Sequence, residues 1–323
     1  AVQTGSVNLG QGFPDTDGPD LVLHAAREAI AAGHNQYPPG RGIPALREAI
    51  AAHQQEFYGQ SYDSATEVLV TAGATEAITA ALLALCEAGD EVVVLEPTYD
   101  SYGAAAALAE AYLRPVRLQA PDYALNVAAL RAAVTPRTRL LLINSPHNPT
   151  GHILDEDECA AIAAVAIEHD LLVVTDEVYE HLTFDGRVHR PLASLPGMRE
   201  RTITISSAGK TFAVTGWKIG WACAPADLTT AVTTVKQFLT YVNGSAFQPA
   251  VALGLRHAHD LVGGIRDALS AQRDLLSAGL ADIGLTVHPS QATYFVTVDV
   301  ASLGETSGLD FCRRLPHRCG VVA

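Results

Sequence analysis

Lys210 and Asp176 are the two residues of this sequence whose types and positions best suit covalent chemistry. The chain has three lysines against 18 arginines, and two of the lysines, Lys210 and Lys218, are eight residues apart. Arginine cannot replace lysine where an amine must lose its proton and form a covalent bond. A partly buried lysine has a lowered pKa, and its neutral amine can form an imine with an aldehyde. The sequence therefore favours Lys210 as a nucleophilic amine.

Asp176 ends the apolar run LLVVTD, which predicts a carboxylate at the end of a buried strand. A buried carboxylate needs a cationic partner, and a protonated pyridine nitrogen is one. At about 4 Å and an effective dielectric constant near 20, their attraction is on the order of 4 kcal/mol. A ring that is kept cationic accepts electrons from a carbanion. The alternative is that Asp176 only caps the next helix.

The segment TAGATEA at 71–77 is typical of a phosphate site at the start of a helix. Its backbone N–H groups at Gly73, Ala74 and Thr75 have few side chains in the way. Ser207 and Lys218 would add a hydroxyl group and a cation. The alternative is an ordinary capped helix without a ligand.

Three more side chains fit a planar cofactor. Tyr179 and Asn148 are placed to donate hydrogen bonds to a phenolic oxygen, and Tyr99 to stack on a ring. Taken alone, the sequence around Asn148 is a common turn, and an isolated tyrosine more often serves packing.

Two other motifs overlap Lys210. The letters GKT suggest a nucleotide-binding loop, but that motif needs a glycine six residues before the lysine, where Thr204 stands. Ser207-x-x-Lys210 fits an acyl-enzyme pattern whose other elements the sequence lacks.

Short apolar runs alternate with alanine-rich helical stretches, and each run ends in a polar cluster. This alternation predicts an α/β fold with a mostly parallel central sheet flanked by helices. Because ligands bind beyond the carboxyl ends of parallel strands, the clusters are expected to converge on one site. The expected strands are 91–95, 139–143, 171–174 and 202–205, and the expected helices are 75–87, 125–133 and 156–169.

A length of 323 residues favours two domains. The expected division is a large cofactor-binding domain at 30–250 and a smaller α+β domain formed by 1–29 and 251–323. Within the smaller domain, the alternating sequence TYFVTV at 293–298 predicts a strand.

Composition excludes several classes of function. A net charge of −14 argues against binding to nucleic acid or to an anionic membrane. No apolar run is long enough to span a bilayer. The five cysteines show no disulfide or zinc-ligand spacing, so no metal is expected and a cytoplasmic location is favoured.

Taken together, the motifs resemble the class I/II aminotransferases of the aspartate-aminotransferase fold. The resemblance runs from Val7 to the end of the chain, and Asp176 and Lys210 are 34 residues apart in its two most specific motifs. The motifs are NLGQGFPD, NQYPPG, TAGATEA, INSPHNPTG, TDEVYEHL and SSAGKTFAVTGWKIGW.

The resemblance implies fold type I of the pyridoxal-phosphate-dependent transferases, with Lys210 holding the cofactor as a Schiff base. It implies that Tyr37 reaches the phosphate of a second subunit in a homodimer, and that Gly12 lies against the substrate carboxylate, next to Asn148. By the same resemblance, Asp176 is the pyridinium partner, Tyr179 and Asn148 contact the phenolic oxygen, and Tyr99 stacks on the ring. The phosphate would be held by Gly73, Ala74, Thr75, Ser207 and Lys218. The carboxylate-binding arginine of the family is expected beyond residue 323, so Arg313 and Arg314 are not assigned that role.

The implied reaction is a ping-pong transfer of an amino group from an amino acid to a 2-oxo acid. The residues of the motifs are most similar to those of N-succinyldiaminopimelate aminotransferases, which belong to lysine biosynthesis. Kynurenine, glutamine and methionine aminotransferases and a cysteine-conjugate β-lyase remain alternatives. A nucleotide-binding module and an inactive cofactor-bound domain are alternatives from other classes.

Overall fold

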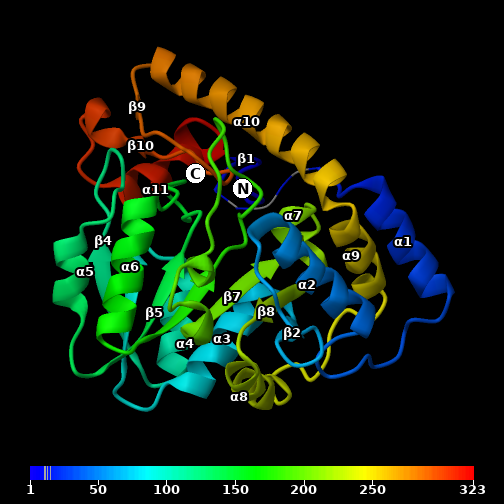
Figure 1. The fold of residues 1–323 in the computed structure, drawn as a ribbon. Helices are drawn as coiled ribbons and strands as arrows, with labels where there is room; N and C mark the ends of the chain where they lie inside the picture. Colours follow the sequence, from blue (N-terminus) through cyan, green and yellow to red (C-terminus); the bar gives the residue numbers. More distant parts are fainter. Residues whose placement is uncertain (11, 13, 15) are drawn as a thin grey trace.

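The computed structural model describes residues 1–323 except 11, 13 and 15. Within the described residues, a seven-stranded sheet has the order β2-β8-β7-β6-β5-β3-β4 (Figure 1). Strands β4, β3, β5, β6 and β7 run parallel to one another, whereas β8 is antiparallel to both β7 and β2. The mostly parallel sheet is therefore confirmed. Its strands are β2 (Val68–Thr71), β3 (Glu91–Glu96), β4 (Tyr112–Arg117), β5 (Thr138–Asn144), β6 (Leu172–Asp176), β7 (Thr202–Ser207) and β8 (Gly220–Cys223).

The apolar strands are buried on both faces. In β3, Val92 and Val94 pack on one side of the sheet, while Val93 and Leu95 pack on the other, as the alternation of side chains along a strand requires. Helices α3 (Gly73–Leu85), α4 (Asp100–Leu108) and α8 (Ala226–Lys236) contribute to the first core. Helices α5 (Val127–Ala133) and α6 (Glu156–Glu168) contribute to the second. The helices expected from the sequence are thus present, with ends shifted by two residues or fewer.

A third group of helices covers the β2–β8 side of the sheet. Helices α2 (Pro44–Tyr58) and α9 (Phe247–Arg256) share a core with β2 and β8, and α1 (Asp20–Ala31) packs against α9. The long helix α10 (Ala258–Asp282) crosses the upper part of the molecule in Figure 1.

The two ends of the described chain lie together. Strand β1 (Val7–Asn8) pairs in parallel with β11 (Val321–Val322), which follows α11 (Gly308–Arg318), and both termini lie near β1 in Figure 1. This pairing joins the N-terminal and C-terminal segments that are expected to form the smaller domain. The division at residues 30 and 250 remains a prediction.

The strand predicted at 293–298 is wrong for most of its length. Only Val298 is in a strand, β10 (Val298–Asp299), which pairs with β9 (Thr286–Val287). Thr293 has a φ of 71°, and its hydroxyl accepts a hydrogen bond from the N–H of Phe295. The Ser290 hydroxyl donates to the carbonyl groups of Ala292 and Phe295. Local turn bonds therefore replace a strand ladder, and alternation of side chains alone could not reveal this.

Among the described residues, no helix has the length and apolar character needed to cross a bilayer. The five cysteines are all free.

Candidate active site

One cavity of about 630 Å³ lies beyond the carboxyl ends of β5, β6 and β7. It brings together all of the candidate residues except Tyr37. The lining includes Gly12, Gly73, Ala74, Thr75, Tyr99, Asn148, Asp176, Tyr179, Ser207, Lys210 and Lys218. The motif NLGQGFPD includes residues 11, 13 and 15, which lie outside the described residues.

Lys210 lies in the short helix α7 (Ala208–Thr211), directly after β7. Its half-buried amine donates hydrogen bonds to the carbonyl oxygen of Gly12, at 3.0 Å, and to the hydroxyl of Tyr294. Burial lowers the pKa of Lys210 to about 8, with a smaller effect of Lys218 in the same direction, while Asp176 opposes both. A substantial fraction of this amine is therefore neutral, and so nucleophilic, in mildly alkaline solution.

Asp176 is the last residue of β6 and is 5% exposed. Tyr102, in α4, donates a hydrogen bond of 2.7 Å to its Oδ2. Burial raises the pKa of Asp176 to about 6, although the Tyr102 bond, the N–H of Val178 and Lys210 all favour the ionised form. A cation placed against this carboxylate would relieve the cost of burying its charge.

Helix α3 begins at the cavity, where Gly73 has a φ of 76° that few other residues adopt. A Cβ atom on Gly73 would lie 3.0 Å from Nζ of Lys218. A Cβ atom on Gly220 would lie 2.5 Å from the carbonyl carbon of Gly73. Two glycines thus allow β8, the lysine and the first N–H groups of α3 to approach one another. This is the donor set that binds a phosphate group.

The remaining candidates lie around the same space. Tyr179 donates a hydrogen bond of 3.4 Å to Tyr294. Asn144 accepts a hydrogen bond of 2.7 Å from the backbone N–H of Asn148 and donates one of 2.8 Å to the carbonyl group of Asp176. The turn at Asn148 is thereby held beside the end of β6. Tyr99, 37% exposed, contacts Tyr102 edge to face.

Tyr37 lies away from the cavity. It is 81% exposed, and its ring packs edge to face against Tyr241, which is 53% exposed. Its expected contact with a second subunit remains a prediction.

Sequence reasoning missed two tyrosines. Tyr102 follows Tyr99, the residue before α4, by three positions, a spacing that favours contact between the two side chains at the start of a helix. Tyr294 was assigned to the strand that proved wrong, and its hydroxyl bridges Lys210 and Gly12 instead. The Tyr102 spacing was a usable signal, whereas nothing in the sequence pointed to the Tyr294 contact.

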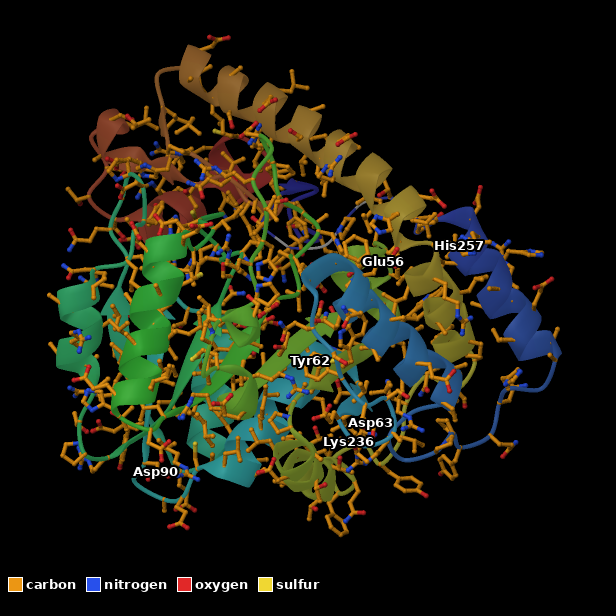
Figure 2. All side chains as sticks on the ribbon, in the orientation of Figure 1. Glu56, Tyr62, Asp63, Asp90, Lys236 and His257 are labelled. Atoms are coloured by element: carbon orange, nitrogen blue, oxygen red, sulfur yellow. The ribbon has the colours of Figure 1, made fainter. Side chains whose placement is uncertain are left out.

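The third lysine lies outside the cavity and binds backbone carbonyl groups. Lys236 ends α8, where Figure 2 labels it. Its amine donates hydrogen bonds to the carbonyl groups of Gly40 at 3.2 Å and Tyr241 at 2.6 Å. It therefore ties two loops together and does not line the cavity.

The residues of the cavity fit pyridoxal phosphate. An amine with a lowered pKa, a buried carboxylate in need of a cation, and a helix start that glycines keep open all face one space. The fit rests on these three features, each of which matches a different chemical group of the cofactor.

A model of the family described as aminotransferase class I and II matches residues 4–323. The chain therefore belongs to the class I and II aminotransferase family, whose members are generally dependent on pyridoxal phosphate. It is an aminotransferase of EC class 2.6.1.

The similar proteins are aminotransferases with different substrates. The chain is 56% identical to a Mycobacterium tuberculosis protein named probable N-succinyldiaminopimelate aminotransferase DapC, across 100% of this chain and 82% of the relative. It is 38% identical to the methionine aminotransferase of Escherichia coli, across 100% of this chain and 84% of the relative.

Two solved structures have the same fold as this chain. The structure of N-succinyldiaminopimelate aminotransferase from Mycobacterium tuberculosis matches with a TM-score of 0.98 at 56% identity, over 100% of this chain and 84% of the other. The aspartate aminotransferase of Thermus thermophilus with maleate matches with a TM-score of 0.93 at 34% identity, over 98% of this chain and 82% of the other. The expected aspartate-aminotransferase fold is confirmed.

Proposed function

We propose that this chain is a pyridoxal-phosphate-dependent N-succinyl-LL-2,6-diaminopimelate:2-oxoglutarate aminotransferase of lysine biosynthesis. The observation that carries the proposal is the 56% identity, along the whole chain, to the Mycobacterium tuberculosis protein named probable N-succinyldiaminopimelate aminotransferase DapC. The relatives named for methionine and for kynurenine are 35–38% identical.

In this proposal each wall of the cavity holds a different part of the cofactor. The first N–H groups of α3, with Ser207 and Lys218, bind the phosphate. Asp176 faces the ring nitrogen, and Tyr99 stacks on the ring. Tyr179 and Asn148 donate to the phenolic oxygen, and Gly12 and Asn148 lie beside the substrate carboxylate.

The bound cofactor supplies an electron-accepting ring that stabilises negative charge at the substrate Cα. Lys210 first holds the cofactor covalently. When it no longer holds the cofactor, the Lys210 amine would be the general base that moves the proton at the substrate Cα. In a ping-pong cycle the same residues would serve both half-reactions, with the 2-oxo acid as the second substrate.

Asp176 contributes through its charge. Its carboxylate keeps the ring nitrogen protonated, and the hydrogen bond from Tyr102 keeps the carboxylate in place. Because Asp176 is buried, this attraction is stronger than it would be in water.

The proposed enzyme is a cytoplasmic homodimer with the active site at the interface. Tyr37 and Tyr241 form an exposed aromatic pair, with Phe238 and Leu239 exposed beside them. Aromatic side chains are enriched in protein interfaces, and the resemblance assigns Tyr37 to the phosphate of the second subunit.

A screen of amino donors tests the substrate. The full-length enzyme is loaded with pyridoxal phosphate and assayed with N-succinyl-LL-2,6-diaminopimelate, methionine, kynurenine and glutamine, with 2-oxoglutarate as the acceptor. We expect the succinylated diamine to have the highest kcat/KM. Higher kcat/KM for methionine or kynurenine would overturn the substrate assignment. Release of pyruvate and ammonia from a cysteine conjugate without an acceptor would reveal a β-lyase.

A further inference from the structure

A buried group of polar side chains lies on the α2 side of the segment that follows β6. After Asp176, consecutive turns are closed by hydrogen bonds from the N–H of Glu180 to Glu177 and from the N–H of Leu182 to Tyr179. Tyr179 lines the cofactor cavity, whereas His181 contacts His53 of α2. The same short segment therefore serves two different sites.

His53 and His181 share one hydrogen bond. Their Nε2 atoms are 2.7 Å apart, so one imidazole donates its N–H and the other accepts it. His53 is 1% exposed and His181 is 8% exposed. Burial lowers the pKa of His53 to about 3, and burial with the neighbouring His53 places the pKa of His181 well below its usual value. The imidazole that accepts this hydrogen bond must be neutral at Nε2, and neutral imidazole is the form in which histidine binds metals.

Glu180 completes the group. One ligating atom of Glu180 and one from each histidine lie within 4.8 Å of one another. The carboxylate accepts a hydrogen bond from Ser206 at Oε1. Its Oε2 is buried and meets no partner within strict hydrogen-bond geometry among the described residues, but the Tyr58 hydroxyl faces this carboxylate as a hydrogen-bond donor. A buried oxygen in this condition is costly unless a cation or a donor reaches it.

The spacing suits a small divalent cation. Ligand atoms around a tetrahedral Zn²⁺ are about 3.3 Å apart, given bonds of roughly 2.0–2.1 Å. The Nε2 atoms of the two histidines, 2.7 Å apart, are closer than this. The three ligand atoms, including one from Glu180, all lie within 4.8 Å of one another. Modest rotations of the three side chains would reach the tetrahedral spacing. Two imidazoles and one carboxylate favour Zn²⁺ over Mg²⁺ or Ca²⁺, which prefer oxygen ligands.

We propose that His53, Glu180 and His181 form a structural binding site for a divalent transition metal, most suitably Zn²⁺, that fixes α2 against the segment after β6. The two histidines bind as neutral imidazoles and the glutamate as a carboxylate, leaving a fourth position for water. No zinc-ligand spacing was found in the sequence because 128 residues separate the two histidines. The site stands apart from the aminotransferase chemistry, so either proposal can fail alone.

Metal analysis of the untagged protein is the direct test. The protein is incubated with ZnSO₄, passed through a desalting column with a weak chelator and measured by mass spectrometry. We expect about one Zn²⁺ per chain in the unchanged protein and in the control His24→Gln, and below about 0.2 in His53→Gln and His181→Gln. His24 is the matched control because it is exposed and pairs with the exposed Glu28. Less than about 0.2 Zn²⁺ in the unchanged protein, or equal content in His53→Gln, overturns the proposal.

A second measurement needs no variant. Binding to the folded state alone raises the melting temperature, so Zn²⁺ is expected to raise it by about 3 °C or more, whereas equal Mg²⁺ leaves it unchanged. Co²⁺ in place of Zn²⁺ should give the visible absorption of a tetrahedral site. The absence of both effects in the unchanged protein also overturns the proposal, even if the histidine variants fail to fold.

Discussion

Tyr102, in helix α4, donates a hydrogen bond of 2.7 Å to Oδ2 of Asp176, which is 74 residues away in the sequence. The two residues are buried together, Tyr102 at 2% and Asp176 at 5% exposure. The bond favours the ionised carboxylate in a place where burial disfavours it. Helix α4, through Tyr102, therefore stabilises the ionised form of the carboxylate that strand β6 places at the cavity.

Removing this hydroxyl group should impair turnover. In Tyr102→Phe the carboxylate loses a donor that stabilises its charge, so the pKa of Asp176 should rise further. A hydrogen bond to a charged group contributes about 1.5–3 kcal/mol, which predicts a fall in kcat on the order of tenfold or more. Steady-state kinetics measure it, with Tyr112→Phe, an exposed tyrosine in β4, as the control. Equal kcat in the two variants would show that the Tyr102 bond has no part in the reaction.

The charge of Asp176 should lower the stability of the cofactor-free protein at high pH. Its pKa in the folded protein is about 6, above its value of 3.8 in an unfolded chain, because burial disfavours the carboxylate. The folded state binds the proton more tightly, so stability is lost as the pH rises from about 4 through 6. Asp176→Asn should be more stable than the unchanged protein at pH 8, by about 1–3 kcal/mol, and not at pH 4.

Urea unfolding of both cofactor-free proteins at the two pH values measures this difference. The same variant should have almost no aminotransferase activity. A variant that is destabilised equally at both pH values would contradict the account of Asp176.

The nucleophilicity of Lys210 should follow its lowered pKa. Burial lowers that pKa to about 8, so the neutral fraction of the amine increases as the pH rises through this value. We expect labelling of Lys210 by pyridoxal and borohydride to increase with a midpoint near pH 8. Peptide mass spectrometry distinguishes it from Lys218 and Lys236, the other two lysines. A midpoint near the ordinary value of 10.5 would be incompatible with a buried amine.

Lys210→Ala gives the corresponding loss of function. We expect no borohydride-reducible visible absorbance after incubation with pyridoxal phosphate, and almost no turnover. An unchanged spectrum would refute the assignment of this lysine.

Gly220 should be intolerant of any side chain. A Cβ atom would lie 2.5 Å from the carbonyl carbon of Gly73 and 2.7 Å from the N of Ala74, so β8 and α3 would have to separate. Gly220→Ala should lower the free energy of unfolding by about 1–3 kcal/mol and weaken the binding of pyridoxal phosphate. The control is Gly103→Ala in α4, which meets no atom within 4 Å and should stabilise the protein by up to about 1 kcal/mol. Equal stability of the two variants would show that β8 and α3 can separate without cost.

The sequence by itself determined the fold class and the residues that gather at the cavity. Runs such as EVVVL at 91–95 are too apolar for a half-exposed strand, so they had to be covered on both faces, which fixed an α/β sheet. Polar residues directly after such runs, among them Asp176 and Lys210, then had to meet at one edge of that sheet. Both inferences depend on local pattern, which a sequence displays directly.

Only the tertiary structure decided which distant side chains meet. Tyr294 reaches Lys210 because residues 290–295 form local turn bonds rather than a strand, and His53 reaches His181 because α2 packs beside the segment after β6. These contacts join residues 84 and 128 positions apart. Such pairing is set by how helices and loops pack on the finished sheet, and no spacing along the chain encodes it.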